Sequence, residues 1–226
     1  VWDSQRSAIS INGSATLPTN GNIVRYNLVY QRPQTTNGAN GILIADLGNQ
    51  PLSDTEVYGN VVNNFNEIGI FVYGAQNNGT EVYNNTAYNC HRAYCLMDMA
   101  SCSATVKNNI GVTNLDGWHP VFSLDNTSTS NKIVDYNLWL KTGTDDAVVQ
   151  NEYTTYSDLP SWRSATGFDA NSILADPRFV NAGAGNFELS AGSPAIDEGA
   201  VVGLTEDFMG TPIPQGTAPD MGAYEY

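Results

Sequence analysis

The chain has 226 residues, with 9 Lys and Arg against 23 Asp and Glu, so its formal net charge is −14. A surface of that sign repels polyanions, which argues against nucleic acid and anionic lipid as partners. No apolar run reaches the roughly 18 residues of a membrane-spanning helix, so we expect no membrane segment. The chain opens at Val1-Trp2-Asp3 without a recognisable secretory leader, as expected of a mature or excised segment.

Residues 1–22 contain one strand candidate, residues 8–11, and predict an incomplete first coil. From residue 23 to residue 140 the chain then repeats one short sequence motif with a period of about 25 residues. Each copy has a Val, a corner, an Asn and a second β-prone run. Short strands repeated at this period are typical of a solenoid, and five copies in register argue against a β-sandwich with an accidental repeat.

The repeated Asn is expected to make the corner, because Asn tolerates the left-handed backbone of a sharp bend. Stacked at the same corner of successive coils, these amides can also hydrogen-bond to one another. The predicted ladder consists of Asn27, Asn60, Asn85, Asn109 and Asn137.

A second family of strands precedes each corner, at residues 41–45, 69–73, 93–97 and 121–125. One coil therefore has three short strands. Because successive side chains of a strand point to opposite faces, alternation assigns one inward and one outward set. The predicted outward rows are Leu43, Phe71, Cys95 and Ser123, followed by Ala45, Tyr73, Met97 and Asp125.

Residues 141–175 leave the repeat, and residues 153–168 predict a short helix or turn laid against the solenoid. Residues 177–226 predict a tail that caps the solenoid and packs on its side, since a solenoid end exposes an apolar cross-section. We therefore expect one domain over residues 1–226, with coils in 1–140 and irregular packing and a cap in 141–226. The predicted class is an all-β, right-handed parallel β-helix of about five to six coils.

The Gly-Ile strands and the Val-x-x-Asn-Asn-Thr text resemble the right-handed parallel β-helix of the pectate-lyase-like superfamily over residues 23–140. The motifs Asp176-Pro-x-Phe, Ser193-Pro-Ala-Ile-Asp and Asp220-x-Gly-Ala-Tyr-Glu resemble the C-terminal tail of secreted bacterial β-helix proteins. One departure is Ile213, where that tail usually has Arg before Pro. The resemblance implies the fold and a secreted, extracellular bacterial protein, but no particular activity.

Three cysteines lie within one coil, at Cys90, Cys95 and Cys102. One disulfide is possible, with Cys95–Cys102 the pairing we favour, and three buried free thiols are the alternative.

An enzymatic site would need two facing carboxylates, as in glycoside hydrolases. Asp98 and Asp125 on adjacent coils are the candidate pair, with Glu67 in reserve, although an Asp often closes a turn by accepting local amide hydrogen bonds. A polysaccharide lyase needs basic groups or Ca²⁺ to neutralise a uronate. The candidate region has one Arg and no Lys, so lyase chemistry would require Ca²⁺ at Asp98 and Asp125.

A metal site is a further alternative, because His91 and His119 fall on neighbouring coils near Glu67. Histidine is a common metal ligand, but solvated loop histidines are the more usual case. No other cofactor is expected.

The interpretation we favour is a non-catalytic binding module. Aromatic faces stack on sugar rings while polar side chains bind the hydroxyls, and an exposed apolar row on a solenoid indicates a partner. In size, coil number and tail, the chain is similar to the β-helical xylan-binding modules of carbohydrate-binding module family 89. That resemblance implies xylan or another neutral plant polysaccharide as ligand, a monomer tethered to a glycoside hydrolase domain, and a role in plant cell wall degradation. The candidate ligand-binding residues are Phe71, Tyr73, Arg92, Met97, Asp98, Trp118, His119 and Asp125. A structural or adhesive β-helix without a sugar ligand remains a third class.

Overall fold

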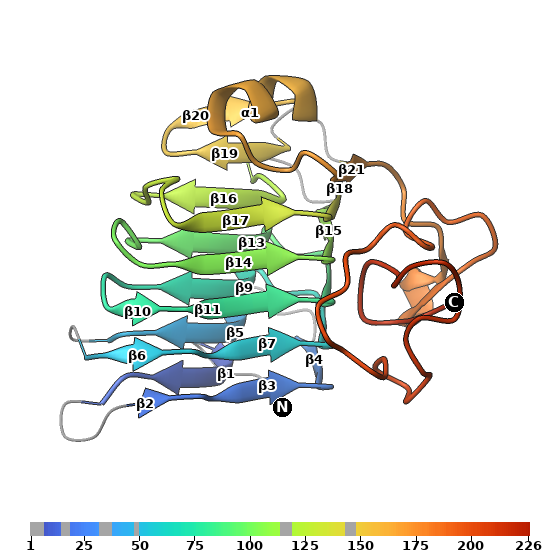
Figure 1. Ribbon diagram of the computed structural model, residues 1–226, viewed down its shortest axis with the longest axis horizontal. Helices are drawn as coiled ribbons and strands as arrows, with labels where there is room; N and C mark the ends of the chain where they lie inside the picture. Colours follow the sequence, from blue (N-terminus) through green and yellow to red (C-terminus); the bar gives the residue numbers. More distant parts are fainter. Residues whose placement is uncertain (1–6, 15–18, 32–37, 48–49, 114–118, 143–147) are drawn as a thin grey trace.

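The computed structural model describes residues 7–14, 19–31, 38–47, 50–113, 119–142 and 148–226 (Figure 1). These residues form an all-β, right-handed parallel solenoid, which confirms the predicted fold class. The solenoid has about four turns rather than five to six.

A complete coil contributes one strand to each of three sheets, in which the strands run parallel except for β20. Sheet A consists of β1 (Ser7–Asn12), β5 (Asn40–Ala45), β9 (Ile68–Tyr73), β13 (Arg92–Met97), β16 (Phe122–Asp125), β19 (Val149–Asn151) and β20 (Thr154–Tyr156). Sheet C consists of β3 (Ile23–Arg25), β7 (Glu56–Tyr58), β11 (Thr80–Tyr83), β14 (Ala104–Lys107) and β17 (Lys132–Asp135). Sheet D consists of β4 (Leu28–Tyr30), β8 (Val61–Asn63), β12 (Thr86–Tyr88), β15 (Ile110–Thr113), β18 (Leu138–Lys141) and β21 (Ile173–Leu174). A short sheet joins β2 (Thr19–Asn20), β6 (Leu52–Ser53) and β10 (Asn77–Asn78).

The interior of the solenoid is apolar, as alternation predicts. All eight residues assigned inward in sheet A are buried: Ile42, Ile44, Ile70, Val72, Tyr94, Leu96, Phe122 and Leu124. In the later coils the interior is aromatic, and the rings of Phe122 and Trp139 stack with their centroids 5.6 Å apart. Stacking neighbours therefore bury a continuous core that no single coil could form.

The asparagine ladder runs along the corner between sheets C and D. Consecutive amides bond from Nδ2 to Oδ1, at 2.9 Å from Asn60 to Asn85 and 3.0 Å from Asn85 to Asn109. The corner itself differs from the prediction, because the residue before each ladder Asn takes the left-handed backbone. Its φ is +49° at Asn84 and +55° at Tyr136. The ladder residues thus satisfy the corner's backbone groups, while the preceding residues make the bend.

The C-terminal end of the solenoid is covered by α1 (Leu159–Thr166), at the top of Figure 1. Asp158 caps this helix by accepting from the Ser161 amide at 2.7 Å. Within this helix, Trp162 has a fully buried side chain. Its ring meets Phe122 of the last coils edge to face, with ring centroids 6.2 Å apart. The expected helix is therefore confirmed, and it covers the end of the core.

Sheet A also continues past the predicted limit of the coils at residue 140. The strand β19 pairs in parallel with β16, and β20 then pairs antiparallel with β19. The repeat was not recognisable here, because the strand lacks the Gly-Ile text and the next strand reverses the chain direction.

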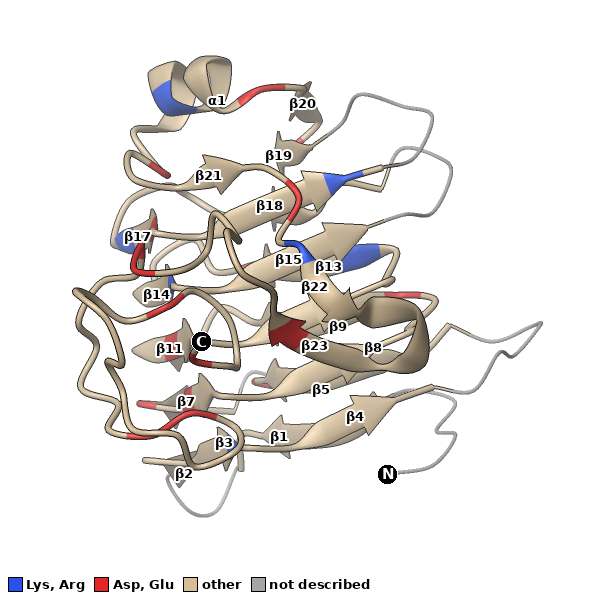
Figure 2. Cartoon of the chain, turned by 90° about the vertical axis from the view of Figure 1, so that its right-hand side faces the viewer, with Lys and Arg blue, Asp and Glu red and all other residues tan. Residues whose placement is uncertain are grey.

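The tail packs on the side of the solenoid, across sheet D (Figures 1 and 2). It contains the hairpin of β22 (Phe179–Asn181) and β23 (Asn186–Leu189), joined by a short 3₁₀ turn at Ala182–Ala184. Met221 and Ala195 join Ile110 and Leu138 in one buried cluster. The tail therefore packs along the side of the solenoid, while the end of the core is closed by α1.

The three cysteines are free and buried, so the favoured Cys95–Cys102 disulfide is wrong. Cys90 and Cys102 are buried within the core cluster, whereas Cys95 points outward from β13 by alternation. Within the described part of the chain, no helix is long and apolar enough to cross a membrane.

Candidate functional site

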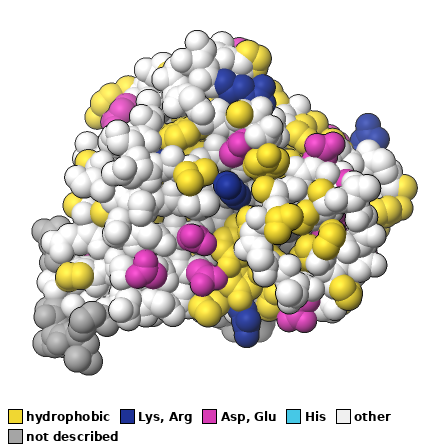
Figure 3. Space-filling view, in the orientation of Figure 1, with side chains coloured by type: hydrophobic (Ala, Val, Ile, Leu, Met, Phe, Trp, Pro, Cys, Tyr) yellow, Lys and Arg dark blue, Asp and Glu magenta, His cyan; other side chains and the backbone are white. Residues whose placement is uncertain are grey.

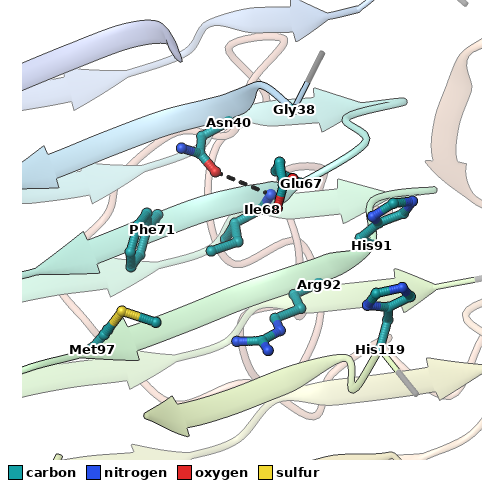
Figure 4. Close-up of a pocket in the computed structure, with 9 residues that line it drawn as sticks. All are labelled: Gly38, Asn40, Glu67, Ile68, Phe71, His91, Arg92, Met97 and His119. Carbon is teal, nitrogen blue, oxygen red and sulfur yellow. Dashed lines mark hydrogen bonds between the residues drawn. The ribbon is translucent and has the colours of Figure 1, made fainter. Parts of the chain in front are cut away.

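Two adjoining hollows lie on the outer face of sheet A, with volumes of about 430 and 420 Å³. Arg92 and Met97 line both, so we treat the two as one groove, called the sheet A groove below. The first hollow is lined by Gly38, Asn40, Glu67, Ile68, Phe71, His91, Arg92, Met97 and His119 (Figure 4). The second is lined by Arg92, Met97, Asp98, Asp125, Asn126, Gln150, Glu152 and Tyr153.

The register of the parallel strands creates the two outward rows that the sequence predicts. Cys95 lies opposite Phe71 and Ser123, and Met97 lies opposite Tyr73 and Asp125. The first row differs from the prediction in one respect. Cys95 and Ser123 point outward but are only 1% and 0% exposed. The guanidinium of Arg92 covers them, with Nη1 3.3 Å from Ser123 Oγ and 3.9 Å from Cys95 Sγ.

Arg92 and Asp125 form an ion pair at the boundary between the two hollows, through Arg92 Nη1 and Asp125 Oδ2. Gln150 holds the other carboxylate oxygen, since its Nε2 donates to Asp125 Oδ1 at 3.3 Å. The side chains of Arg92 and Asp125 remain 17% and 16% exposed. The pair is therefore fixed from three strands and is still reachable from the groove.

Asp98 lies just after β13 in a left-handed turn, with φ of +57°. Its Oδ1 accepts a hydrogen bond from Asn126 Nδ2 on the next coil. Its negative charge raises the pKa of the Tyr73 phenol, and burial and a hydrogen bond act in the same direction. Asp98 thus connects three coils at the edge of the groove.

The imidazole rings of His91 and His119 stack in the first hollow, with centroids 4.4 Å apart and planes 11° apart. Because their planes are nearly parallel, their nitrogen lone pairs do not converge on one point. Burial lowers the pKa of His91, while the nearby Glu67 opposes this shift. Among the residues that the structure describes, no three His, Cys, Asp or Glu side chains are grouped closely enough to hold a metal ion. This finding gives no support to the Ca²⁺ or His91–His119–Glu67 alternatives.

Most of the predicted site residues come together in the groove. Phe71, Arg92, Met97 and His119 line the first hollow, and Asp98 and Asp125 line the second. Tyr73 packs against Phe71 with ring centroids 5.8 Å apart, beside the hollows rather than in them. Trp118 lies outside the described residues.

The sequence reasoning missed the side chains that close the second hollow, namely Asn126, Gln150, Glu152 and Tyr153. Gln150 continues the first outward row, because it pairs with Ser123 across β16 and β19. The Val148-Val149 pair before it is a β-prone signal that could have extended the repeat by one more strand.

The tail leaves the groove open, because none of residues 177–226 lines either hollow. The face that carries sheet C and the tail is shown in Figure 3, where acidic and apolar side chains are scattered and no histidine appears. The two stacked histidines come from the segments just before β13 and β16 of sheet A.

No family model matches the chain. A curated protein from Bacillus subtilis (strain 168), the uncharacterized protein YwoF, is 26% identical over 152 residues. The match covers 64% of this chain and 31% of YwoF, so the matched segment is about a third of that protein's length. This similarity carries no information on activity, since the relative is itself uncharacterised.

Proposed function

We propose that the protein is a non-catalytic carbohydrate-binding module that binds a neutral polysaccharide along the sheet A groove, with xylan as the first candidate. The observation that carries the proposal is the continuity of the two hollows through Arg92 and Met97. Neighbouring strands of a sheet lie about 4.8 Å apart, so a groove that crosses β9, β13, β16 and β19 is long enough for several sugar rings.

The chemistry of the groove supports a sugar ligand. Phe71, Met97 and the stacked His91–His119 pair offer apolar and planar surface, against which the C–H faces of sugar rings can pack. The second hollow offers the side-chain amides of Asn126 and Gln150 to sugar hydroxyl groups. It also offers the carboxylates of Asp98, Asp125 and Glu152. Small-molecule sites commonly combine a mostly apolar lining with a few oriented polar groups.

Charge favours a neutral ligand over a polyuronate. The net charge of −14 repels polyanions at long range. Within the groove, the positive charge of Arg92 is already paired with Asp125, and Glu67, Asp98 and Glu152 add carboxylates. A secreted bacterial protein attached to a glycoside hydrolase domain would be the natural setting for such a module.

The test is isothermal titration calorimetry with soluble xylan, mannan, cello-oligosaccharides and pectin, combined with an assay for released sugar ends. We expect binding to xylan without product, and a loss of about tenfold in affinity, or ~1.4 kcal/mol, for Phe71→Ala. The matched control is Tyr30→Ala, which removes an exposed aromatic ring from sheet D. If the protein bound none of these glycans, the proposal would be contradicted.

Asp98 and Asp125 line the same hollow, and this placement keeps a glycoside hydrolase as the second candidate. Released reducing ends that disappear in Asp98→Asn and Asp125→Asn would establish that activity instead. The pairing of Asp125 with Arg92 and Gln150 favours recognition, because both carboxylate oxygens already have partners within the protein.

A further inference from the structure

The ion pair between Arg92 and Asp125 links the two hollows of the sheet A groove. Arg92 begins β13, and its side chain runs across the outward row to reach Asp125 at the end of β16. Along the way it covers Cys95 and Ser123, which would otherwise face the groove. The guanidinium plane is therefore part of the groove floor.

The carboxylate is fixed as firmly as the guanidinium. Asp125 Oδ2 accepts a hydrogen bond from Arg92 Nη1 and lies 3.8 Å from Cys95 Sγ. Its other oxygen, Oδ1, accepts a hydrogen bond from Gln150 Nε2. Gln150 is itself buried and also donates to the Glu152 carbonyl. A binding group that is already held in place loses little conformational entropy when a ligand arrives.

The pair presents a hydrogen-bond donor group and an acceptor group side by side at the surface of the groove. Two hydroxyls on adjacent ring carbons match this arrangement, because each hydroxyl both donates and accepts. Hydrogen bonds to charged groups are also stronger than those between neutral groups. Phe71 and Met97 line the first hollow together with Arg92 and would pack against the ring that carries the two hydroxyls (Figure 4).

We propose that Arg92 and Asp125 determine the specificity of the groove by selecting a sugar that presents a free vicinal diol. This inference rests on the proposed glycan-binding function and adds that the groove recognises a vicinal diol of the sugar. Glycans whose two adjacent hydroxyls are both substituted would lose the paired contact and would also clash with the fixed ion pair. Neutral glycans with free diols would bind, whatever their chain length.

The experiment compares two ligands by calorimetry: a xylo-oligosaccharide with free O2 and O3 hydroxyls, and the same oligosaccharide acetylated at both positions. We expect the native protein to bind the free-diol ligand at least tenfold more tightly. The variants Arg92→Lys, which keeps the charge but loses the planar fork, and Asp125→Asn, which keeps the shape, should each reduce this ratio to near one. Thermal unfolding and circular dichroism of both variants verify that the solenoid is intact.

A matched control is Lys107→Gln, which alters a cationic side chain on sheet C, and it should leave the ratio unchanged. Equal binding of the two ligands by the native protein, or a preserved ratio in Arg92→Lys, would overturn the inference and leave the glycan-binding function standing. Loss of binding to every glycan tested would overturn both. The reactivity of Cys95 gives a second readout of the position of Arg92, since Arg92→Ala should expose this thiol to a thiol reagent.

Discussion

Asn60 and Asn85 lie directly above one another in consecutive coils, and Asn60 Nδ2 donates to Asn85 Oδ1 at 2.9 Å. The same Nδ2 donates to the carbonyls of Val24 and Tyr58, and Asn85 Oδ1 also accepts from the Asn60 amide. Each interior member of the ladder thus satisfies groups in its own coil and in the coils on both sides. The ladder couples neighbouring coils at a position where the backbone turns too sharply for strand pairing.

Asn85→Ala should destabilise the protein by about 3–5 kcal/mol, because it leaves several buried polar groups without partners. Urea unfolding measures the loss. Asn27→Ala is the matched control at the first coil, where the amide is only half-buried and bonds to Arg25 and Asn60. We expect a loss of about 1 kcal/mol there. Equal losses at the two positions would contradict a cooperative ladder.

Gly111→Ala should destabilise the protein by about 1–3 kcal/mol through overpacking. A Cβ at this position of β15 would lie 2.7 Å from Val121 Cγ1 and 2.9 Å from the Trp139 ring, and neither group has room to move in the core. Gly183→Ala is the control, since its nearest neighbour, Asn181 Oδ1, would be 3.8 Å away. A drop in the urea midpoint is expected for Gly111→Ala alone.

The stability of the protein should fall as the pH rises through about 6, because of Asp169. Burial raises the pKa of this carboxyl to about 6, although Ser172, Trp162, Asn137 and Trp139 donate hydrogen bonds to it. In the unfolded chain the pKa returns to its ordinary value near 3.8, so the folded state binds the proton more tightly. This stabilisation is complete below pH 3.8 and is lost as the pH passes 6.

Thermal unfolding at pH 4.5 and pH 7.5 tests this prediction. In Asp169→Asn, the difference in the free energy of unfolding between these two pH values should shrink by on the order of 2–3 kcal/mol. Asp220, whose pKa burial also raises to about 6, contributes in the same direction and remains in that variant. Glu198→Gln is the control variant, because it removes one acidic charge from an exposed position. An unchanged pH dependence in Asp169→Asn would refute the assignment.

The cysteines should not react with thiol reagents in the folded protein. Burial raises the pKa of Cys90 and of Cys95 to about 12, and it raises the pKa of Cys102 as well. The thiolate is the reactive form, so labelling should require unfolding. Mass spectrometry after treatment with a thiol reagent should show no adduct in buffer and three adducts in denaturant. Rapid labelling of native protein would contradict the burial of these thiols.

The sequence predicted the coil, the three sheets and the ladder, because each of these repeats with the same period and alternation amplifies the signal. It did not predict the cover of Arg92 over Cys95 and Ser123. Alternation says which side of a strand a residue points to, but not whether a long side chain from elsewhere lies over it. The disulfide was wrong for a different reason, since Cys95 faces outward while Cys90 and Cys102 are held in the core.

The second hollow shows a related limit. Gln150 belongs to a strand that follows the regular repeat, and its role depends on pairing with β16 rather than on any local text. Phe71, Met97 and Asp125 were predicted because they lie within the regular coils. The candidate site was therefore predictable up to the last regular coil and not beyond it.

The reversal of chain direction at β20 has a consequence for the behaviour of the protein in concentrated solution. A parallel solenoid can in principle be extended by another chain that adds strands to its last coil, as in fibre growth. Here the final strand of sheet A runs against the others, and α1 lies over the core beside it. A second molecule arriving at this end would meet one strand of opposite polarity in sheet A and a helix over the core, and both features disfavour end-to-end polymerisation.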